Sequence, residues 1–444
     1  MKPIEFIHKL RWQQIPKHVQ HQVKRCLLDT IGAAIGGRRM RLSGIIYDFV
    51  DAVYGGKGAH LWLDGREVSP VGAALAHGMT IDALDIHDNF NQAKGHAGVA
   101  IVPATLATLR LNPDAKISGQ ELLTTLAVGY EVALRAGLAL HTTACDYHTS
   151  GAWNALGCAA IVARRLGLKK EMTRHALGIA EYHGPRSQMM RCIDHPTMLK
   201  DGSGWGAMAG VSAGLLAHKG FTGAPAVTVE SHEVSEIWTD IGNQWYLMEQ
   251  DFKRHAVCHW AQPPIAGTLD LMHTHNISPQ QIEHIQVITF HEATRLICRH
   301  PKTTEEAQYS LPFPVAAAVI YGDLGPDELS EKAFTDQRVL ELANRIEISE
   351  DDFCNTQFPG TQIARVCIKT TGGQTFESDT MESPWDKSEI QQPHQPPDQE
   401  LQEKFHWLVS GSLSKSRAIE LEDKIWHCDA FNDAETFTNL LISS

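Results

Sequence analysis

The densest group of polar side chains in this 444-residue sequence is the segment DIHDNFNQAKGH, residues 85–96. It follows an apolar helical stretch, and Asp85, Asp88 and Asn89 would share one helix face if that helix continued. Acidic side chains at the end of a helix oppose the helix dipole, so a stabilising role explains them poorly. The segment therefore suits acid/base chemistry, and the alternative is a solvated turn with a helix cap.

Two histidines stand just before long stretches rich in small residues. His96 lies before AGVAIVPATLATL, and His148 lies before TSGAWNALG. An imidazole titrates near neutral pH and a helix N-terminus favours anions, so the pair suits proton transfer on a carboxylate ligand. The alternatives are a structural or exposed histidine and, beside His148, an N-cap supplied by Thr149 or Ser150.

Positive charge is available at two further places. Lys200 precedes a Gly-rich segment, residues 202–206, where the backbone can approach a ligand closely. The Gly-x-Gly-x-x-Ala spacing of this segment resembles a dinucleotide-binding fingerprint, but no strand pattern precedes the segment. Lys253, Arg254 and His259 fall within FKRHAVCHWAQPP, which could equally be a solvated basic run.

The sequence lacks the spacings typical of resident cofactors. It contains no H-E-x-x-H or EF-hand pattern, and none of its nine cysteines forms a C-x-x-C pair. We therefore expect no metal, no iron–sulfur centre and no nucleotide cofactor.

The formal charge is -13, from 52 acidic and 39 basic residues. The electrostatic field of a protein with this net negative charge repels nucleic acid. An anionic substrate could bind only at a local cluster of cationic side chains. The sequence contains no uninterrupted apolar run of membrane-spanning length, so we expect no membrane partner. Scattered cysteines indicate reduced thiols and a cytoplasmic location.

The pattern of apolar residues predicts a mostly α protein. Spacings of three and four residues run to about residue 227, whereas 282–290 and 364–370 alternate like strands. A hairpin signal follows at 371–377. The predicted helices are 18–35, 71–84, 99–109, 119–138, 152–166, 204–218, 310–321, 327–345 and, after a Pro- and Gln-rich linker at 383–400, much of 401–441.

These elements predict two domains. A discontinuous all-helical bundle would comprise residues 1–250 plus 395–444, with a smaller α+β lid domain, residues 251–394, inserted between them and ending in the linker.

Several blocks resemble the MmgE/PrpD family, which includes 2-methylcitrate dehydratases, cis-aconitate decarboxylases and an iminodisuccinate epimerase. The resemblance implies a helical domain with an α+β lid, usually a homodimer, and an active site in the cleft between them. It matches Asp85 to the first acid of a D-x-D-D-type motif, His96 and His148 to two block-opening histidines, and Lys200 and Lys253 to two lysines. The blocks include HGMTIDALDIHDNF, GYEVALRAG, YHTSGAWNALGCAAIVARRLGL, LKDGSGWGAMAGVSAGLLAHKGFTG, FKRHAVCHWAQPP and YSLPFPVAAAVIYGDL.

The chain departs from the family pattern beside the expected pocket. Ala97 and Thr149 stand where Pro is frequent, and the loop before His96 is longer by one residue. Asp82 replaces a frequent His, Asn89 a usual Thr, and Phe313 a common Tyr. The resemblance alone therefore does not identify the substrate.

The expected activity is that of a lyase on a small di- or tricarboxylate, foremost the dehydration of a 2-methylcitrate-like hydroxy acid. His148 and His96 would be the acid and the base, in either order, and Asp85 an orienter or proton relay. Lys200, Lys253, Arg254, Asn89 and His259 would bind substrate. Alternatives are decarboxylation of a cis-aconitate-like acid, epimerisation, and a non-catalytic ligand-binding homologue.

Overall fold

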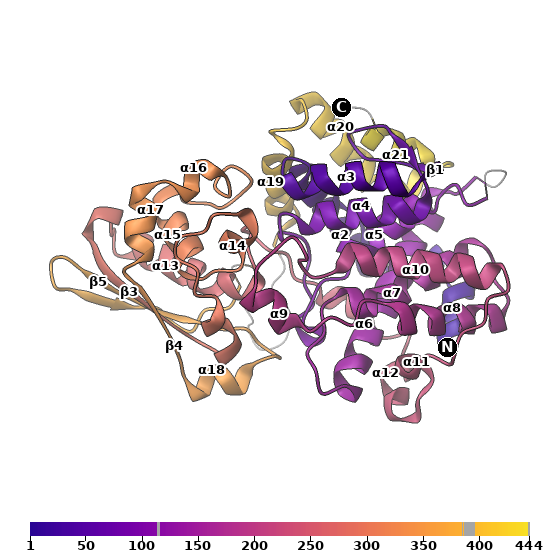
Figure 1. Cartoon of the computed structure of the whole chain (residues 1–444), viewed down its shortest axis with the longest axis horizontal. Coiled ribbons are helices and arrows are strands. Elements are labelled where there is room, and N and C mark those ends of the chain that lie inside the picture. The colour runs from indigo at the N-terminus through magenta and orange to yellow at the C-terminus, as the bar shows by residue number, and fades with distance from the viewer. Residues whose placement is uncertain (113–115, 384, 386–395, 443–444) are drawn as a thin grey trace.

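The computed structural model of the protein describes residues 1–112, 116–383, 385 and 396–442. These residues form 21 α-helices and six β-strands, so the mostly α prediction is confirmed. In Figure 1 a large helical body lies beside a smaller one that carries the main sheet.

Close helix packing builds the large body. Gly78 and Gly204 meet where two central helices cross, and a Cβ at Gly78 would lie 2.6 Å from the Gly204 Cα. The small side chains predicted to permit close contact therefore do so here. The central helices are α2 (Lys17–Gly37), α4 (Pro70–Asp82), α5 (Gly98–Ala107), α6 (Gly119–Thr143), α7 (Gly151–Arg165) and α10 (Ser203–His218).

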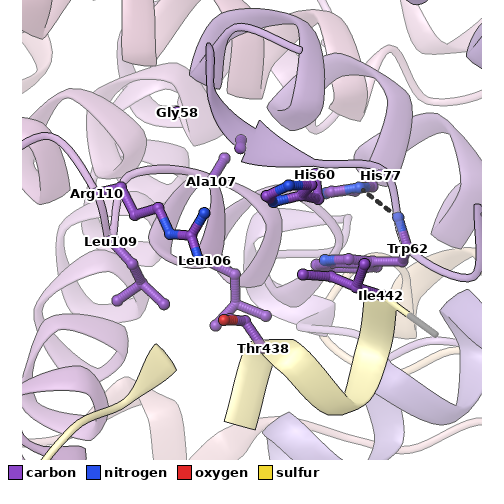
Figure 2. Close-up of a pocket in the computed structure, with 11 residues that line it drawn as sticks. Gly58, His60, Trp62, His77, Leu106, Ala107, Leu109, Arg110, Thr438 and Ile442 are labelled. Carbon is purple, nitrogen blue, oxygen red and sulfur yellow. Dashed lines mark hydrogen bonds between the residues drawn. The ribbon is translucent and has the colours of Figure 1, made fainter. Parts of the chain in front are cut away.

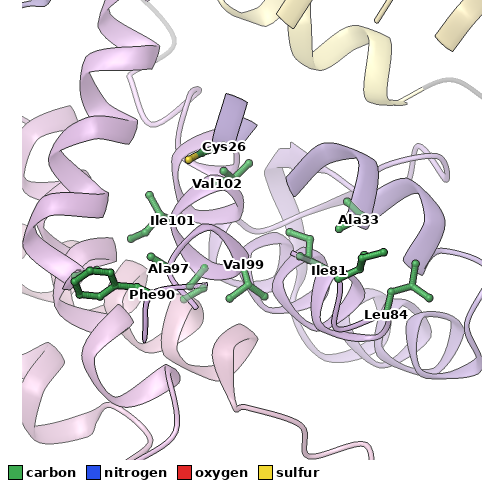
Figure 3. Close-up of a cluster of buried hydrophobic side chains, with 14 of the residues drawn as sticks. Cys26, Ala33, Ile81, Leu84, Phe90, Ala97, Val99, Ile101 and Val102 are labelled. Carbon is green, nitrogen blue, oxygen red and sulfur yellow. The ribbon is translucent and has the colours of Figure 1, made fainter. Parts of the chain in front are cut away.

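Figure 3 shows part of the apolar core formed by α2, α4 and α5 and by the segment between the latter two. Ile81 and Leu84 lie at one side of this cluster and Phe90 and Ala97 at the other. All four side chains are almost completely buried. The core thus continues through the polar 85–96 segment and anchors it at both ends.

The other helices of the large body that precede residue 240 in the sequence surround the central helices. They are α1 (Pro3–Lys9), α3 (Arg41–Val53), α8 (Lys170–His183), α9 (Met189–Asp194), α11 (Val227–Glu230) and α12 (Ser235–Thr239). A small antiparallel sheet, β1 (Gly55–His60) with β2 (Glu67–Val68), stands beside α3 and α4 and was not expected.

The smaller body holds a four-stranded sheet in the order β4-β3-β5-β6. β3 pairs parallel with β4 and antiparallel with β5, and the tight turn after Thr370 joins β5 to β6 as predicted. The strands are β3 (Ile282–Thr289), β4 (Ile346–Glu350), β5 (Arg365–Thr370) and β6 (Thr375–Glu377). Its helices are α13 (Gln262–Thr274), α14 (Thr304–Gln308), α15 (Pro312–Tyr321), α16 (Glu331–Phe334), α17 (Gln337–Ala343) and α18 (Asp352–Gln357).

One predicted helix, 327–345, is wrong as a single element. The structure breaks it into α16 and α17. Asp336 lies between them in an extended conformation, and its side chain accepts a hydrogen bond from the Arg338 backbone N–H. This N-cap starts a new helix where periodicity alone predicted a continuous one.

The C-terminal helices return to the large body. Figure 1 shows α19 (Asp398–Val409), α20 (Lys415–Trp426) and α21 (Glu435–Ile442) on the same side as α3 and α4, and α19 and α20 both contact α2. Most of the predicted linker lies outside the described residues, and its last residues belong to α19. The exact domain boundaries stay a prediction.

Helix α6 is the one described helix long and apolar enough to cross a membrane. Within its most apolar window 94% of the residues are buried inside the protein, which is the environment of a core helix.

Candidate active site

The turn at Asp85 is formed by a tertiary contact. Helix α4 ends at Asp82, and Asp85 adopts a left-handed conformation with φ 52°. The buried Lys253 ammonium donates to the Asp85 carbonyl at 2.8 Å and also pairs with its carboxylate. The helix therefore does not continue, and the predicted shared face of Asp85, Asp88 and Asn89 is wrong.

Asp88 anchors the loop internally. Its carboxylate accepts hydrogen bonds from the Tyr130 hydroxyl at 2.6 Å and from the Gly98 N–H at 3.0 Å. Burial raises the pKa of Asp88 to about 6. Asp88 is thus a structural acid at the start of α5.

His96 is oriented by the same loop. Its Nδ1 lies 2.8 Å from the Asp88 carbonyl, which can only accept, so Nδ1 carries the proton. Its Nε2 lies 4.0 Å from Asp85 Oδ1. Burial, aided by Lys253, holds the pKa of His96 well below its usual range. A neutral imidazole with a free Nε2 is the form required of a general base.

Lys200 is held next to the same group. Its ammonium donates to the Gln308 side chain and lies 4.7 Å from the centre of the Tyr309 ring. The Gln308 amide in turn donates to the Ala83 carbonyl at 2.9 Å. Sequence reasoning missed Gln308, because nothing near it in the chain marks it as a partner of Lys200.

The two lysines set the charge state of Asp85. Burial alone would raise its pKa, but Lys253, then Lys200 and His87, hold the pKa of Asp85 below its usual range. Asp85 is therefore ionised at neutral pH. The site combines an ionised acid, two buried ammonium groups and a neutral imidazole.

His259 belongs to this group through its electrostatic interactions with Asp85 and Lys253. Its Nδ1 lies 2.6 Å from the Gln362 Oε1, and burial lowers the pKa of His259 to about 4. Among the described residues its Nε2 has no hydrogen-bond partner. This ring nitrogen is available to a ligand.

His148 is not joined to Asp85 by any contact within the described part of the chain. Its Nδ1 lies 2.8 Å from the Asp146 carbonyl, and its backbone N–H donates to His141. Burial and then Arg186 lower its pKa. Its participation in the same site stays a prediction.

The loop after His148 nevertheless reaches His96. Ser150 Oγ accepts a hydrogen bond from the His96 backbone N–H at 2.9 Å, and its hydroxyl also bonds the Asp201 carboxylate. Neither Ser150 nor Thr149 makes the N-cap bond that the sequence allowed. The Ser150 hydroxyl instead ties the two histidine-bearing loops together.

Two predicted substrate ligands lie elsewhere. The Arg254 side chain is 46% exposed and donates to Asp323 at 3.2 Å, and both residues line a groove of 450 Å³. Asn89 exchanges two backbone hydrogen bonds with Asp251, and its amide donates to Asn91. Asn89 thus holds the chain leading to Lys253 in place.

His77 also points away from Asp85, although the helical spacing put it one or two turns before that residue. Its ring stacks on Trp62 with centroids 3.8 Å apart, and its Nε2 accepts from the Trp62 backbone N–H. Figure 2 shows this stack beside a small cavity lined by Arg110 and Thr438. His77 is a structural histidine of the helical body.

A carboxylate–imidazole triad lies at the end of α4. Side-chain oxygens of Asp82 and Asp85 and a ring nitrogen of His87 all lie within 4.8 Å of one another, a spacing that could hold a divalent ion. No metal was expected from the sequence because H-E-x-x-H, EF-hand and C-x-x-C spacings are absent. The spacing of this triad in the sequence, D-x-x-D-x-H, is none of these. The Gly-rich segment, by contrast, follows α9 and not a strand, which removes the dinucleotide alternative.

Comparison with known proteins finds one family over both bodies of the molecule. The MmgE/PrpD N-terminal domain matches residues 4–240 and the MmgE/PrpD C-terminal domain matches residues 255–427. Similar curated proteins include the cis-aconitate decarboxylase of Homo sapiens, 24% identical over 98% of this chain and 92% of that protein. The cis-aconitate decarboxylase of Aspergillus terreus is 22% identical over 97% of this chain and 93% of its own length.

A cis-aconitate decarboxylase-like protein of Aspergillus oryzae, oryM, is likewise 22% identical over 98% of this chain and 95% of its own length. At this identity the reaction of a relative does not transfer by itself. The two domain matches together cover most of the sequence, and the chain belongs to the MmgE/PrpD family.

Proposed function

We propose that the protein is a lyase that acts on a small di- or tricarboxylate by moving a proton at a carbon next to a carboxylate. The observation that supports this most is the buried Asp85–Lys253 pair with the His96 Nε2 4.0 Å from the Asp85 carboxylate. Fixed ammonium groups stabilise the negative charge that develops when such a carbon loses its proton.

Each group has a distinct role in this proposal. His96 is the base, because its pKa is lowered and its Nε2 has no proton. Lys200 and Lys253 each retain N–H donors beyond those already used, and these bind substrate carboxylates. Asp85 orients Lys253 and relays protons, and His148, whose loop is tied to the His96 loop through Ser150, is the candidate for the second proton-transfer role.

Dehydration of a 2-methylcitrate-like hydroxy acid is the reaction we favour. Decarboxylation of a cis-aconitate-like acid is the second candidate, supported by the names of the curated relatives. Both pass through a carbanion-like species beside a carboxylate, as does epimerisation, so the same groups would serve each.

The test is a product assay on chelator-treated protein. Citrate, 2-methylcitrate and cis-aconitate are each incubated with the enzyme and followed by NMR, with dissolved CO2 measured in parallel. We expect loss of water from a hydroxy acid without release of CO2. Release of CO2 would establish the second candidate, and no conversion of any acid would indicate a ligand-binding homologue.

We also propose a homodimer located in the cytoplasm. Helix α10 exposes Trp205, Met208, Ser212 and Leu216 along one face without a charged side chain, and Trp205 and Leu216 are about two-fifths exposed. A second copy of the chain would cover this face. Light scattering should give twice the mass of the chain, and Trp205→Glu should reduce it to that of a monomer.

A further inference from the structure

The backbone of His96 is held by the first turn of helix α7. Its N–H donates to the Ser150 hydroxyl at 2.9 Å, and its carbonyl accepts a hydrogen bond from the Asn154 amide at 2.8 Å. A Cβ at Gly95 would lie only 2.2 Å from Ser150 Oγ, so the glycine permits this close approach. The bond from Nδ1 orients the His96 ring within its own loop, whereas α7 sets where that loop lies in the molecule.

Asp201 in turn fixes the Ser150 side chain. One oxygen of its carboxylate, Oδ2, accepts a hydrogen bond from the Ser150 backbone N–H at 3.2 Å and also bonds the hydroxyl of that serine. The Asp201 carbonyl accepts a further bond from the Gly151 N–H at 3.2 Å. Burial, followed by Asp82, raises the pKa of Asp201 to about 7. Because a hydroxyl can donate to a carboxylate or accept from a carboxyl group, the bond between Ser150 and Asp201 is available in both charge states.

The turn that contains Asp201 also carries Lys200. Lys200 has a left-handed backbone with φ 50°, and Gly202 follows in the same region with φ 65°. Such a conformation is uncommon in a lysine and persists where the surrounding contacts fix it. Here Lys200 is bonded to Gln308 of the smaller body, and the next residue, Asp201, is bonded to α7 of the large body. A short chain of contacts therefore connects the substrate-binding ammonium group with the backbone of the base.

We propose that Asp201 is a positioning residue that, through Ser150, fixes His96 relative to Lys200. The inference rests on the proposed function, in which Lys200 binds a substrate carboxylate and His96 removes a proton from the neighbouring carbon. Asp201 exchanges no proton with the substrate in this scheme. A base displaced by about 1 Å from the reacting carbon can lose about a hundredfold in rate, so the link affects turnover more than binding.

Two substitutions break the link at different points. Ser150→Ala removes the hydroxyl that joins Asp201 to the His96 N–H, and Asp201→Leu removes the acceptor at a similar side-chain volume. We expect each variant to lower kcat at least about tenfold on whichever carboxylic acid the wild type converts, with KM within about threefold of the wild type. Ser203→Ala is the matched control, because Ser203 is as buried as Ser150 and its hydroxyl has no partner among the described residues. Its kcat should stay close to that of the wild type.

Asp201→Asn distinguishes positioning from a need for charge. The asparagine carbonyl can accept both bonds from Ser150, so kcat should stay within about threefold of the wild type and most of the activity lost in Asp201→Leu should return.

Combining Ser150→Ala with His96→Asn tests whether the link acts through the base. Once the imidazole is gone its position no longer matters, so Ser150→Ala should cause no further loss of kcat in that background. A general structural effect would lower kcat by the same factor in both backgrounds.

Near-wild-type kcat in Ser150→Ala and Asp201→Leu would overturn this inference and leave the proposed function standing. An Asp201→Asn variant as impaired as Ser150→Ala would also overturn it, because a charge or a proton on Asp201 would then be required. So would equal losses from Ser150→Ala with and without the imidazole of His96. If the wild type converts no carboxylic acid, both the proposed function and this inference fail. Ser150→Ala and Asp201→Asn each change a single heavy atom, so they decide the result even if Asp201→Leu does not fold.

Discussion

Single residues in the 85–96 segment have pKa values shifted in opposite directions although they lie within a dozen positions of each other. Asp85 has a lowered pKa, Asp88 a raised one, and His96 a strongly lowered one. Burial causes the shifts at Asp88 and His96, whereas at Asp85 the neighbouring lysines outweigh burial and lower the pKa. Sequence reasoning identified the crowding but not the direction of each shift, because direction depends on partners far away in the chain.

Asp88→Asn tests the raised pKa of Asp88. Its pKa is about 6 in the folded protein against an ordinary 3.8, so the folded state binds the extra proton more tightly. The stability that this proton confers is complete below about pH 4 and is lost as the pH rises through about 6. The wild type should lose about 3 kcal/mol of unfolding free energy relative to Asp88→Asn over that interval.

Urea unfolding of both proteins at about pH 4 and about pH 8 measures this difference. The isosteric variant can keep the contacts to Tyr130 and Gly98. Parallel pH profiles for the two proteins would show that Asp88 is not shifted.

His148→Asn tests whether the second histidine joins the site. If His148 is the acid, turnover should fall about a hundredfold or more, the scale of losing a general acid. His175→Asn is the matched control, since His175 is also bound to a backbone carbonyl, that of Gly223. Turnover of His148→Asn close to that of the control would remove His148 from the mechanism.

At the scale of elements, the active-site turn is held by two lysines that lie far from it in the sequence, Lys253 in a loop and Lys404 in helix α19. From one side Lys253 binds the Asp85 carbonyl at 2.8 Å. From the other, Lys404 of α19 binds the Ile86 carbonyl at 2.8 Å and the Asp29 carboxylate of α2 at 2.5 Å. Helix α19 thus supports the turn through Lys404.

Lys404→Met should therefore destabilise the protein by about 3 kcal/mol or more, because it leaves Asp29 buried without its cation. Adding Asp29→Leu should recover part of that loss, which a double-mutant cycle in urea would measure. Lys24→Met, which removes a lysine paired with the more exposed Asp429, should cost less than about 1 kcal/mol. Additive losses at Lys404 and Asp29 would contradict a direct pair.

The six central helices of the large body were predicted to within five residues at each end, because long apolar runs of small residues form helices whatever surrounds them. The predictions for α2, α6, α7 and α10 are of this kind. The turn after α4 was missed because Lys253, 168 residues away, binds the Asp85 carbonyl. Local periodicity cannot detect a distant side chain that stops a helix.

At the scale of the whole molecule, the chain brings together residues from three distant stretches. The structure brings together at one buried place Asp85 and His96, then Lys200, and then Lys253 and His259, whereas the predicted convergence of His148 with them stays a prediction. Arg254 adjoins Lys253 in sequence but turns to the exposed Asp323. The residue types predicted a cation in this segment, but they could not show that Lys253 and not Arg254 faces inward.

The turnover of His96→Asn tests the central claim most directly. An asparagine amide can keep the bond to the Asp88 carbonyl, so the loop should remain intact and ligand binding should still raise the melting temperature. On whichever carboxylic acid the wild type converts, kcat should fall about a hundredfold or more, since the base is gone. A folded His96→Asn protein with near-wild-type kcat would contradict the assignment of proton transfer to this site.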